Sequence, residues 1–264
     1  MNEKSTVNYY VLLPEEALKA QRFLYVYDSY LKVIPMKRLL NDLLNLFFPR
    51  LCLLCQNPLI KEEKHICLHC LSDLPYTHYT EIQGNPIYDL FIIYTPIQGA
   101  LSLLHFKKKG YGQKLIHSLK YHGNKTLGYD LGYLAATKFQ QSGIFNSVDL
   151  LLPVPLHPKR LRERGYNQSE WIAKGIQSLT GIPIDTTSLC RTRQTESQTH
   201  KQLYERQKNV QDIFQLKTTD FIKGKHILLI DDVITTGSTL KACLKAFKNI
   251  PDIQISILSI ATAL

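Results

Sequence analysis

Long apolar runs are missing from this chain of 264 residues, and none approaches the roughly 18 residues that a membrane-spanning helix needs. The N-terminus carries Glu3, Glu15 and Glu16, and no basic end leads into an apolar stretch. The pattern therefore argues against a membrane span and a secretory signal, and we expect a cytoplasmic protein. With 44% hydrophobic and 20% charged residues, the chain suits one sizeable domain plus a small module.

Two familiar phosphate-binding patterns are also missing. Neither G-x-x-x-x-G-K-[ST] nor G-x-G-x-x-G occurs, and no internal repeat is visible. Any phosphate site in this chain must therefore be built in another way.

Methionine is scarce, since only Met1 and Met36 occur. Residues 1–35 contain no glycine and no cysteine, and Met36 opens the amphipathic run MKRLLNDLLNLFFP. We expect residues 1–35 to be an N-terminal extension, for instance from a misplaced start codon, with the functional chain starting at Met36. A genuine N-terminal helix packed on the domain is the alternative.

Acidic residues are outnumbered, with 22 Asp and Glu against 32 Lys and Arg, which gives a net charge of +10 and a pI near 9.2. Much of the positive charge is clustered at residues 106–109, 157–164 and 190–194. This balance suits an anionic partner such as nucleic acid or a polyphosphate ligand, and a basic surface without a partner is the alternative. The lysines at 107–109 could contact DNA phosphates without sequence preference.

Four of the six cysteines form two C-x-x-C pairs, Cys52 with Cys55 and Cys67 with Cys70. Two such knuckles can supply four thiolates in a tetrahedron, so we predict a structural zinc site. A disulfide and a redox motif are weaker alternatives, because the cytoplasm is reducing and one pair would suffice for redox chemistry. Four sulfurs leave no open position for water and no necessary role for His69, so this zinc should not be catalytic.

From about residue 87 onward, helix and strand patterns alternate. We expect strands at 88–96, 148–156, 227–230 and 253–264, and helices at 112–122, 126–141, 167–181 and 238–249. The polar stretch 191–214 is typical of a mobile functional loop or a disordered insert. The alternation predicts an α/β protein whose parallel sheet is flanked by helices on both faces.

The most informative stretch is HILLIDDVITTGSTL, residues 226–240. Four aliphatic residues predict a buried strand, after which Asp231 and Asp232 should emerge at its carboxyl end. A loop of hydroxyl residues and Gly237 then leads into a helix that Ser238 or Thr239 could cap. Hydroxyls and backbone N–H groups at a helix N-terminus form an anion cradle, while two carboxylates could bind a metal, transfer protons or accept hydrogen bonds from a diol. Together they suit a ribose 5-phosphate; a capped helix with solvated acids is the alternative.

This motif resembles the signature of the type I phosphoribosyltransferases, which bind phosphoribosyl pyrophosphate (PRPP). The resemblance implies that Asp231 and Asp232 contact the ribose 2′ and 3′ hydroxyls. It implies that the 5-phosphate is held by Thr235, Thr236, Gly237, Ser238 and Thr239.

The whole chain from about Met36 resembles the ComF family of competence-associated, phosphoribosyltransferase-like proteins linked to DNA uptake. The resemblance is carried by the order of the two cysteine pairs, LKYHGN, PVPLHPKRLRERGYNQ, RTRQTESQTHKQLYERQKNV and the PRPP signature. It implies a zinc-binding module at residues 36–80 and a phosphoribosyltransferase domain at residues 81–264.

Two further loops complete the expected site. Fixed cations in the pyrophosphate loop would neutralise the leaving group together with Mg²⁺; these are Lys159, Arg160, Arg162 and Arg164. A hood loop could close over the ligand and exclude water; its candidates are Arg191, Arg193, Gln198 and Arg206. A solvated basic turn and a disordered linker are the respective alternatives.

Two functions of different class follow. The first is an enzyme in which a nitrogen nucleophile displaces pyrophosphate from C1 of Mg²⁺-bound PRPP, although no residue is identified that would activate the nucleophile. The second is a binding protein that uses the phosphoribosyltransferase fold as a scaffold or sensor and contacts single-stranded DNA or a helicase-like partner. The acceptor and the catalytic residues are not identified from the sequence.

Overall fold

The computed structural model describes residues 47–121, 123–192 and 213–264. Within them, Cys52–Leu264 belong to one compact unit. The predicted extension, residues 1–35, lies outside the described residues. In the described part of the chain, no helix combines the length and apolar character that crossing a membrane requires.

Helices and strands alternate through the compact unit, largely as predicted. The helices are α3 (Leu68–Ser72), α4 (Pro86–Ile92), α5 (Tyr111–Tyr121), α6 (Lys125–Phe139), α7 (Pro158–Arg164), α8 (Gln168–Thr180) and α9 (Ser238–Ala246). The strands are β1 (Gly99–His105), β2 (Leu150–Pro153), β3 (Leu189–Arg191), β4 (Phe214–Leu216), β5 (His226–Ile234) and β6 (Gln254–Thr262). The predicted helices α5, α6, α8 and α9 and the predicted strands β2, β5 and β6 are therefore confirmed.

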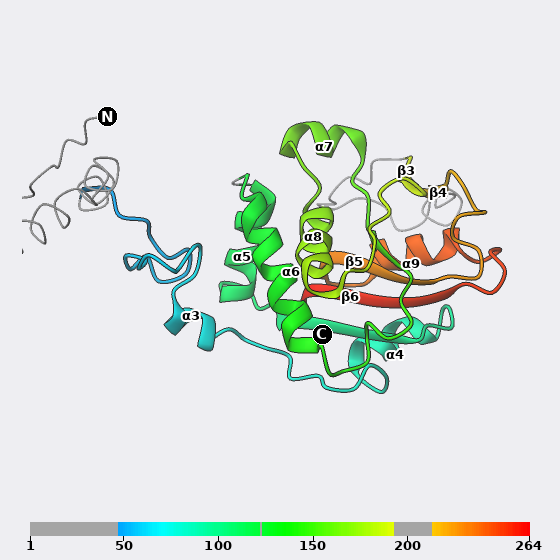
Figure 1. Cartoon of the computed structure of the whole chain (residues 1–264), viewed down its shortest axis with the longest axis horizontal. Helices are drawn as coiled ribbons and strands as arrows, with labels where there is room; N and C mark the ends of the chain where they lie inside the picture. The colour runs from blue at the N-terminus through cyan, green and yellow to red at the C-terminus, as the bar shows by residue number, and fades with distance from the viewer. Residues whose placement is uncertain (1–46, 122, 193–212) are drawn as a thin grey trace, which may run out of the picture. The chain divides into compact units, whose positions relative to one another are not determined.

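Four strands form one parallel sheet in the order β1-β6-β5-β2 (Figure 1). Leu228 of β5 lies opposite Leu151 of β2 on one side and Ser256 of β6 on the other. Strands β3 and β4 pair antiparallel in a separate small sheet. Because the strands of the main sheet are parallel, their carboxyl ends share one edge, and ligands bind at that edge in sheets of this kind.

Alternate residues of β5 face opposite layers of helices. Leu228 and Ile230 are buried in a cluster with residues of α5, α6 and α8. Ile227 and Leu229 are buried in a second cluster with residues of α4 and α9. The sheet is therefore covered on both faces, which explains the unbroken apolar run in the sequence and confirms the predicted α/β class.

The prediction of a strand at residues 88–96 is wrong, because helix α4 occupies most of this segment. Asn85 caps the helix by accepting two backbone N–H groups of the first turn at 3.0 and 3.1 Å, and Pro86 stands in that turn. Ile87 and Phe91, one helical turn apart, are fully buried. Strand β1, which follows this helix, is one of the two edge strands of the sheet.

Residues 52–74, called here the cysteine segment, pack on the same core as the helices. The side chains of Cys52, Leu54, Cys70 and Leu74 are buried in one cluster with residues of α5 and α6. The division into a module at 36–80 and a domain at 81–264 stays a prediction.

Candidate functional site

Asp231 and Asp232, called here the acidic pair, lie inside strand β5. The sequence predicts that the strand ends before them, but β5 continues because β6 pairs beside it, with Asp231 opposite Ser259. On the other side, pairing with β2 stops at Pro153 opposite Ile230. The acidic pair therefore lies at the carboxyl edge of the sheet, just beyond the end of β2.

Both carboxylates are buried, and the protein holds one oxygen of each. Asp231 Oδ1 accepts the backbone N–H of Asp232 at 2.9 Å and the Ser169 hydroxyl at 3.5 Å. Asp232 Oδ1 lies 3.1 Å from Lys120 Nζ. From the described residues, neither Oδ2 atom receives a hydrogen bond, so one oxygen of each carboxylate remains for a ligand.

The surroundings of Asp231 disfavour the ionised form of its carboxyl group. Burial, followed by the charge of Asp232, raises the pKa of Asp231 to about 7, while the ammonium of Lys120 acts in the opposite direction. Strongly shifted pKa values are common among the ionisable groups of functional sites, where burial and neighbouring charges perturb them.

Lys120 belongs to the site although the sequence analysis assigns it no role. It stands in the last turn of α5, and its side chain is 21% exposed. The available signal is its place in LKYHGN, one of the segments that carry the family resemblance. Nothing in the sequence pattern indicates that this lysine meets Asp232, because only the packing of α5 on the sheet brings the two together.

Residues 235–239, called here the hydroxyl loop, comprise the connection after β5 and the first two residues of α9. Gly237 has a φ of 70° and is the N-cap residue of α9, so the prediction that Ser238 or Thr239 caps the helix is wrong. The positive φ at Gly237 favours glycine, and a Cβ there would lie 2.9 Å from a side-chain atom of Leu90 and 3.0 Å from the Phe91 ring. The N–H groups at the start of α9 are therefore not used by a side-chain cap, and Thr235, Thr236 and Ser238 are exposed beside them.

The predicted pyrophosphate loop contains a short helix, α7. The His157 side chain caps it, and Gly165 ends it with a φ of 74°. The helix spreads its cations: Lys159 and Arg162 are exposed, whereas Arg160 and Arg164 are partly buried.

Arg164 turns toward α8 and α5. Its Nη1 donates to Gln168 Oε1 at 3.0 Å, and its guanidinium lies 5.6 Å from the centre of the Tyr121 ring. Tyr121 directly follows Lys120, so the structure brings Arg164 to the end of α5 that carries the lysine.

Arg191, one of the predicted hood residues, ends strand β3. Burial, followed by the charge of Arg160, lowers the pKa of its guanidinium, while Asp231 acts in the opposite direction. Arg191 therefore lies within electrostatic reach of α7 and the acidic pair. The other predicted hood residues, Arg193, Gln198 and Arg206, lie outside the described residues.

The four paired cysteines form one cluster. The sulfur atoms of Cys52, Cys55, Cys67 and Cys70 all lie within 4.8 Å of one another, and Cys55 Sγ is 3.7 Å from Cys67 Sγ. Four sulfurs around a zinc ion at about 2.3 Å would stand about 3.8 Å apart, so the cluster has the size of a tetrahedral site. His69 is exposed, and its Nε2 lies 3.6 Å from Asp73 Oδ2.

Backbone N–H groups point at the sulfur of Cys52. Leu54 and Cys67 donate to it at 3.5 and 3.4 Å. Burial alone would raise the pKa of this thiol, but the backbone hydrogen bonds lower it to about 6. Burial raises the pKa of Cys70 to about 12. A bound cation would stabilise all four groups as thiolates, which fits the donor set to zinc.

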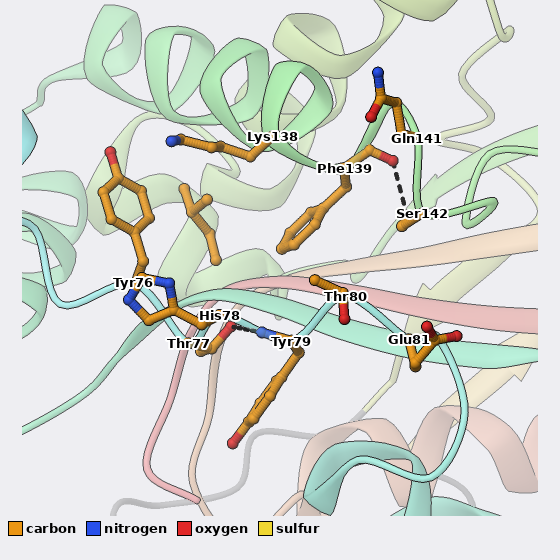
Figure 2. A pocket seen from close by; sticks show the side chains of 11 residues that line it. Tyr76, Thr77, His78, Tyr79, Thr80, Glu81, Lys138, Phe139, Gln141 and Ser142 are labelled. Atoms are coloured by element: carbon orange, nitrogen blue, oxygen red, sulfur yellow. Dashed lines mark hydrogen bonds between the residues drawn. The ribbon is translucent and has the colours of Figure 1, made fainter.

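A separate cavity of about 410 Å³ lies between residues 76–81 and the end of α6 (Figure 2). Lys138 Nζ lies 4.7 Å from the centre of the Tyr76 ring, and the Phe139 ring points toward the cavity floor. None of the predicted site residues lines this cavity, so the acidic pair remains the candidate ligand site.

Comparison with known proteins agrees with this geometry. Residues 173–258 match the phosphoribosyl transferase domain family. Competence protein F of Haemophilus influenzae is 29% identical over 203 residues, covering 75% of this chain and 84% of its own. DNA utilization protein YhgH of Salmonella typhimurium is 26% identical over 212 residues, covering 73% and 88% respectively. Competence protein ComFC of Bacillus subtilis is 27% identical over 219 residues, covering 72% and 85%.

The fold and the matching domain define a phosphoribosyltransferase-like α/β protein with a clustered four-cysteine segment. More particularly, the chain is similar to competence and DNA utilization proteins over most of its length, which supports the resemblance to the ComF family.

Proposed function

We propose that the acidic pair binds the ribose hydroxyls of PRPP, or of a related ribose 5-phosphate ligand, in the presence of Mg²⁺. The observation that carries the proposal is that each buried carboxylate offers one oxygen beyond those the protein uses. The charge of Asp232 acts on Asp231, so the two carboxylates lie close enough for one ligand to reach both, and each of two vicinal hydroxyls could donate one hydrogen bond to them. A charge-assisted hydrogen bond to a carboxylate is also stronger than one between neutral groups.

The hydroxyl loop is the proposed site for the 5-phosphate. Its exposed hydroxyls and the N–H groups at the start of α9 can donate to phosphate oxygens, and the helix dipole favours the negative charge. Buried Gly237 lets the backbone turn sharply there, supported from behind by Phe91 of α4.

The cations around the pair are proposed to face the pyrophosphate, which Mg²⁺ would help to neutralise. Arg160, Arg164 and Arg191 are the partly buried members of this group, and Lys159 and Arg162 are its exposed members. Partly buried cations act on a ligand more strongly than exposed ones, because solvent screens them less. If pentosyl transfer follows binding, these groups would stabilise the departing pyrophosphate while the acidic pair orients the ribose.

Isothermal titration calorimetry with Mg²⁺ and PRPP tests this proposal. We expect one site per chain in the wild type, and loss of binding in Asp232→Asn. Asp252→Asn is the matched control, because Asp252 is an exposed aspartate before β6, away from the acidic pair, and asparagine tolerates its φ of 54°. Absence of binding to the wild type, or equal binding to Asp232→Asn, would overturn the proposal.

We also propose that the cysteine cluster holds one structural zinc ion. The sulfur spacing supports this, and a four-thiolate site suits a protein kept in the reducing cytoplasm. Metal analysis should find one zinc per chain in the wild type and in Cys190→Ser, a cysteine outside the cluster, but much less in Cys52→Ser. Full zinc content in Cys52→Ser would show that the four-thiolate assignment is wrong.

A second candidate function is binding of single-stranded nucleic acid, alone or together with a helicase-like partner. Lys241, Lys245 and Lys248 of α9 and its C-terminal end line a cavity of about 540 Å³ with Tyr94, whose ring centre lies 4.2 Å from Lys241 Nζ. Lysines beside an exposed aromatic ring suit phosphates and stacked bases.

The exposed lysines 107–109 add positive charge elsewhere. Fluorescence anisotropy with labelled oligonucleotides should show salt-dependent affinity that falls in the double variant Lys245→Met, Lys248→Met and is unchanged in Asp232→Asn. Equal affinity in the lysine variant and the wild type would remove this surface as the candidate.

A further inference from the structure

Lys120 contacts the acidic pair from the last turn of α5, shortly before the chain enters α6. Its Nζ lies 3.1 Å from Asp232 Oδ1, and both side chains are largely buried. Burying two charges costs desolvation free energy, so such a pair often contributes little to stability, while removing one partner is strongly destabilising. Because this ion pair lies at the carboxyl edge of the sheet, where ligands bind, we look for its role in function.

The ion pair orients the carboxylate of Asp232. Lys120 occupies Oδ1, which leaves Oδ2 for a ligand hydroxyl. On the neighbouring residue, Ser169 and the backbone hold Oδ1 of Asp231 in the same way. Without Lys120, the carboxylate of Asp232 would lose the contact that fixes its rotation.

The cysteine segment holds the chain on both sides of Lys120. Before it, Lys114 Nζ on α5 donates to the carbonyl of Leu54 at 3.1 Å. After it, His65 Nε2 lies 3.0 Å from the Thr126 hydroxyl, and His65 Nδ1 lies 3.4 Å from Asn124 Nδ2. The cysteine segment thus contacts both α5 and the start of α6, the two helices that the turn after Lys120 connects.

Both helices receive further contacts, one of them at the residue before Lys120. The Tyr166 hydroxyl, from the junction of α7 and α8, donates to the carbonyl of Leu119. Asp130 of α6 forms an ion pair with Lys64 at 3.5 Å, and His65 Nε2 lies 3.7 Å from the same carboxylate. The position of α5 is therefore fixed from the cysteine segment on one side and from the α7–α8 junction on the other.

We propose that Lys120 is a positioning residue of the ligand site, and that the cysteine segment sets its position by holding α5 and α6. The inference rests on the proposed binding of PRPP at the acidic pair. It assigns the cysteine segment a role in ligand binding, through Lys120, that metal coordination alone would not give it.

Three lysine variants test the first part by calorimetry with Mg²⁺ and PRPP. Lys120→Met should weaken binding about tenfold or more, the loss of roughly one charge-assisted contact. Lys120→Arg should recover most of the affinity. Lys174→Met is the matched control, because Lys174 also forms an ion pair, with Glu170 at 2.8 Å, but does so on α8. Affinity of Lys120→Met within twofold of the wild type would overturn the assignment, even if its Tm falls.

A ligand-free readout separates this inference from the proposed function. The charged groups acting on Asp231 are Asp232 on β5, Lys120 on α5 and Arg191 on β3, and the buried thiol of Cys243 on α9 also faces it. Because Lys120 lowers the pKa of Asp231, the carboxyl ¹³C titration of Asp231 should move to higher pH in Lys120→Met and not in Lys174→Met. If the wild type binds no PRPP but this shift occurs, the proposed ligand is wrong and the contact of Lys120 with the acidic pair stands; an unchanged titration overturns that contact and with it the positioning role.

The second part is tested by Lys114→Met, which removes the contact to Leu54 and leaves the acidic pair intact. We expect weaker PRPP binding, together with faster hydrogen–deuterium exchange in residues 111–121. Treatment of the wild type with a zinc chelator should increase exchange in the same residues. Unchanged exchange and affinity in Lys114→Met would show that the cysteine segment does not position α5.

Discussion

At the scale of single residues, the buried carboxyl of Asp231 lowers the stability of the fold when it is ionised. Its carboxyl is buried beside a second carboxyl, and its folded-state pKa of about 7 lies above the ordinary 3.8. Between these two pH values the folded protein binds a proton more tightly than the unfolded chain does. The stability contributed by this group is therefore full below about pH 4 and falls as the pH rises through 7.

Asp231→Asn should consequently be more stable than the wild type at pH 8, by about 1 kcal/mol, because the neutral amide avoids the buried charge. Thermal unfolding from pH 4 to pH 8 should show a smaller decline in Tm for the variant, and calorimetry should show loss of PRPP binding. Asp252→Asn, an exposed control, should follow the wild type. Parallel pH curves for Asp231→Asn and the wild type would contradict the account of the buried charge.

The sequence predicts the residues of the acidic pair but not their full surroundings. Asp231 and Asp232 are visible because they interrupt an apolar strand next to a hydroxyl loop. Lys120 and Ser169 come from helices whose local patterns show only that they are helical. Contacts between segments distant in the chain depend on helix packing, which the periodicity of one segment does not encode.

At the scale of elements, the close crossing of α6 and α8 fixes the N-terminus of α8, which carries Ser169 to the acidic pair. Gly132 of α6 faces the backbone of α8, where a Cβ would lie 2.1 Å from the carbonyl oxygen of Ile172. Gly175 of α8 faces α6 in the same way, at 2.0 Å from the carbonyl oxygen of Tyr129. Helices α6 and α8 lie side by side (Figure 1), and at these two glycines their backbones are too close for a side chain.

Gly132→Ala should lower the free energy of unfolding by about 3 kcal/mol, because the helices must separate to accommodate the methyl group. The intrinsic preference of alanine for helices, about 1 kcal/mol, offsets only part of this cost. Gly128→Ala is the matched control on the same helix, since its Cβ would meet side-chain atoms of Leu119 and Trp171 at 3.1 Å. Chemical denaturation measures both, and equal stabilities of the two variants would show that the crossing is looser than described.

Helices with an extended, periodic apolar face are predictable from the sequence. Short helices whose ends depend on one or two capping residues are less so. Helices α5, α6, α8 and α9 carry extended apolar faces that the sequence displays. Helix α4 was mistaken for a strand because its run of apolar residues, 90–93, outweighs the capping signal of Asn85 and Pro86. The resemblance predicts a loop at the basic segment 158–164, although His157, Pro158 and Gly165 are typical of the ends of a short helix.

At the scale of the molecule, the cysteine segment shares a buried cluster with α5 and α6 instead of having one of its own. Zinc that binds only the folded state stabilises it by mass action, and the benefit extends to every element that unfolds with the site. The shared cluster predicts that the cysteine segment and the sheet unfold cooperatively.

Chelation of zinc should therefore lower the Tm of the wild type in a single transition followed equally by near-UV and far-UV circular dichroism. Cys52→Ser should behave like the chelated wild type, and Cys190→Ser should keep the Tm of the untreated protein. A second, unshifted transition after chelation would instead indicate a sheet domain that folds independently of the cysteine segment.

The central claim is that the acidic pair receives the ribose hydroxyls of PRPP, and a crystal structure with Mg²⁺ and PRPP bound tests it most directly. The account predicts the two ribose hydroxyls within hydrogen-bond distance of Asp231 Oδ2 and Asp232 Oδ2, the 5-phosphate in the hydroxyl loop and Lys120 still on Asp232. A ligand bound elsewhere, or one whose ribose does not reach the acidic pair, would contradict it.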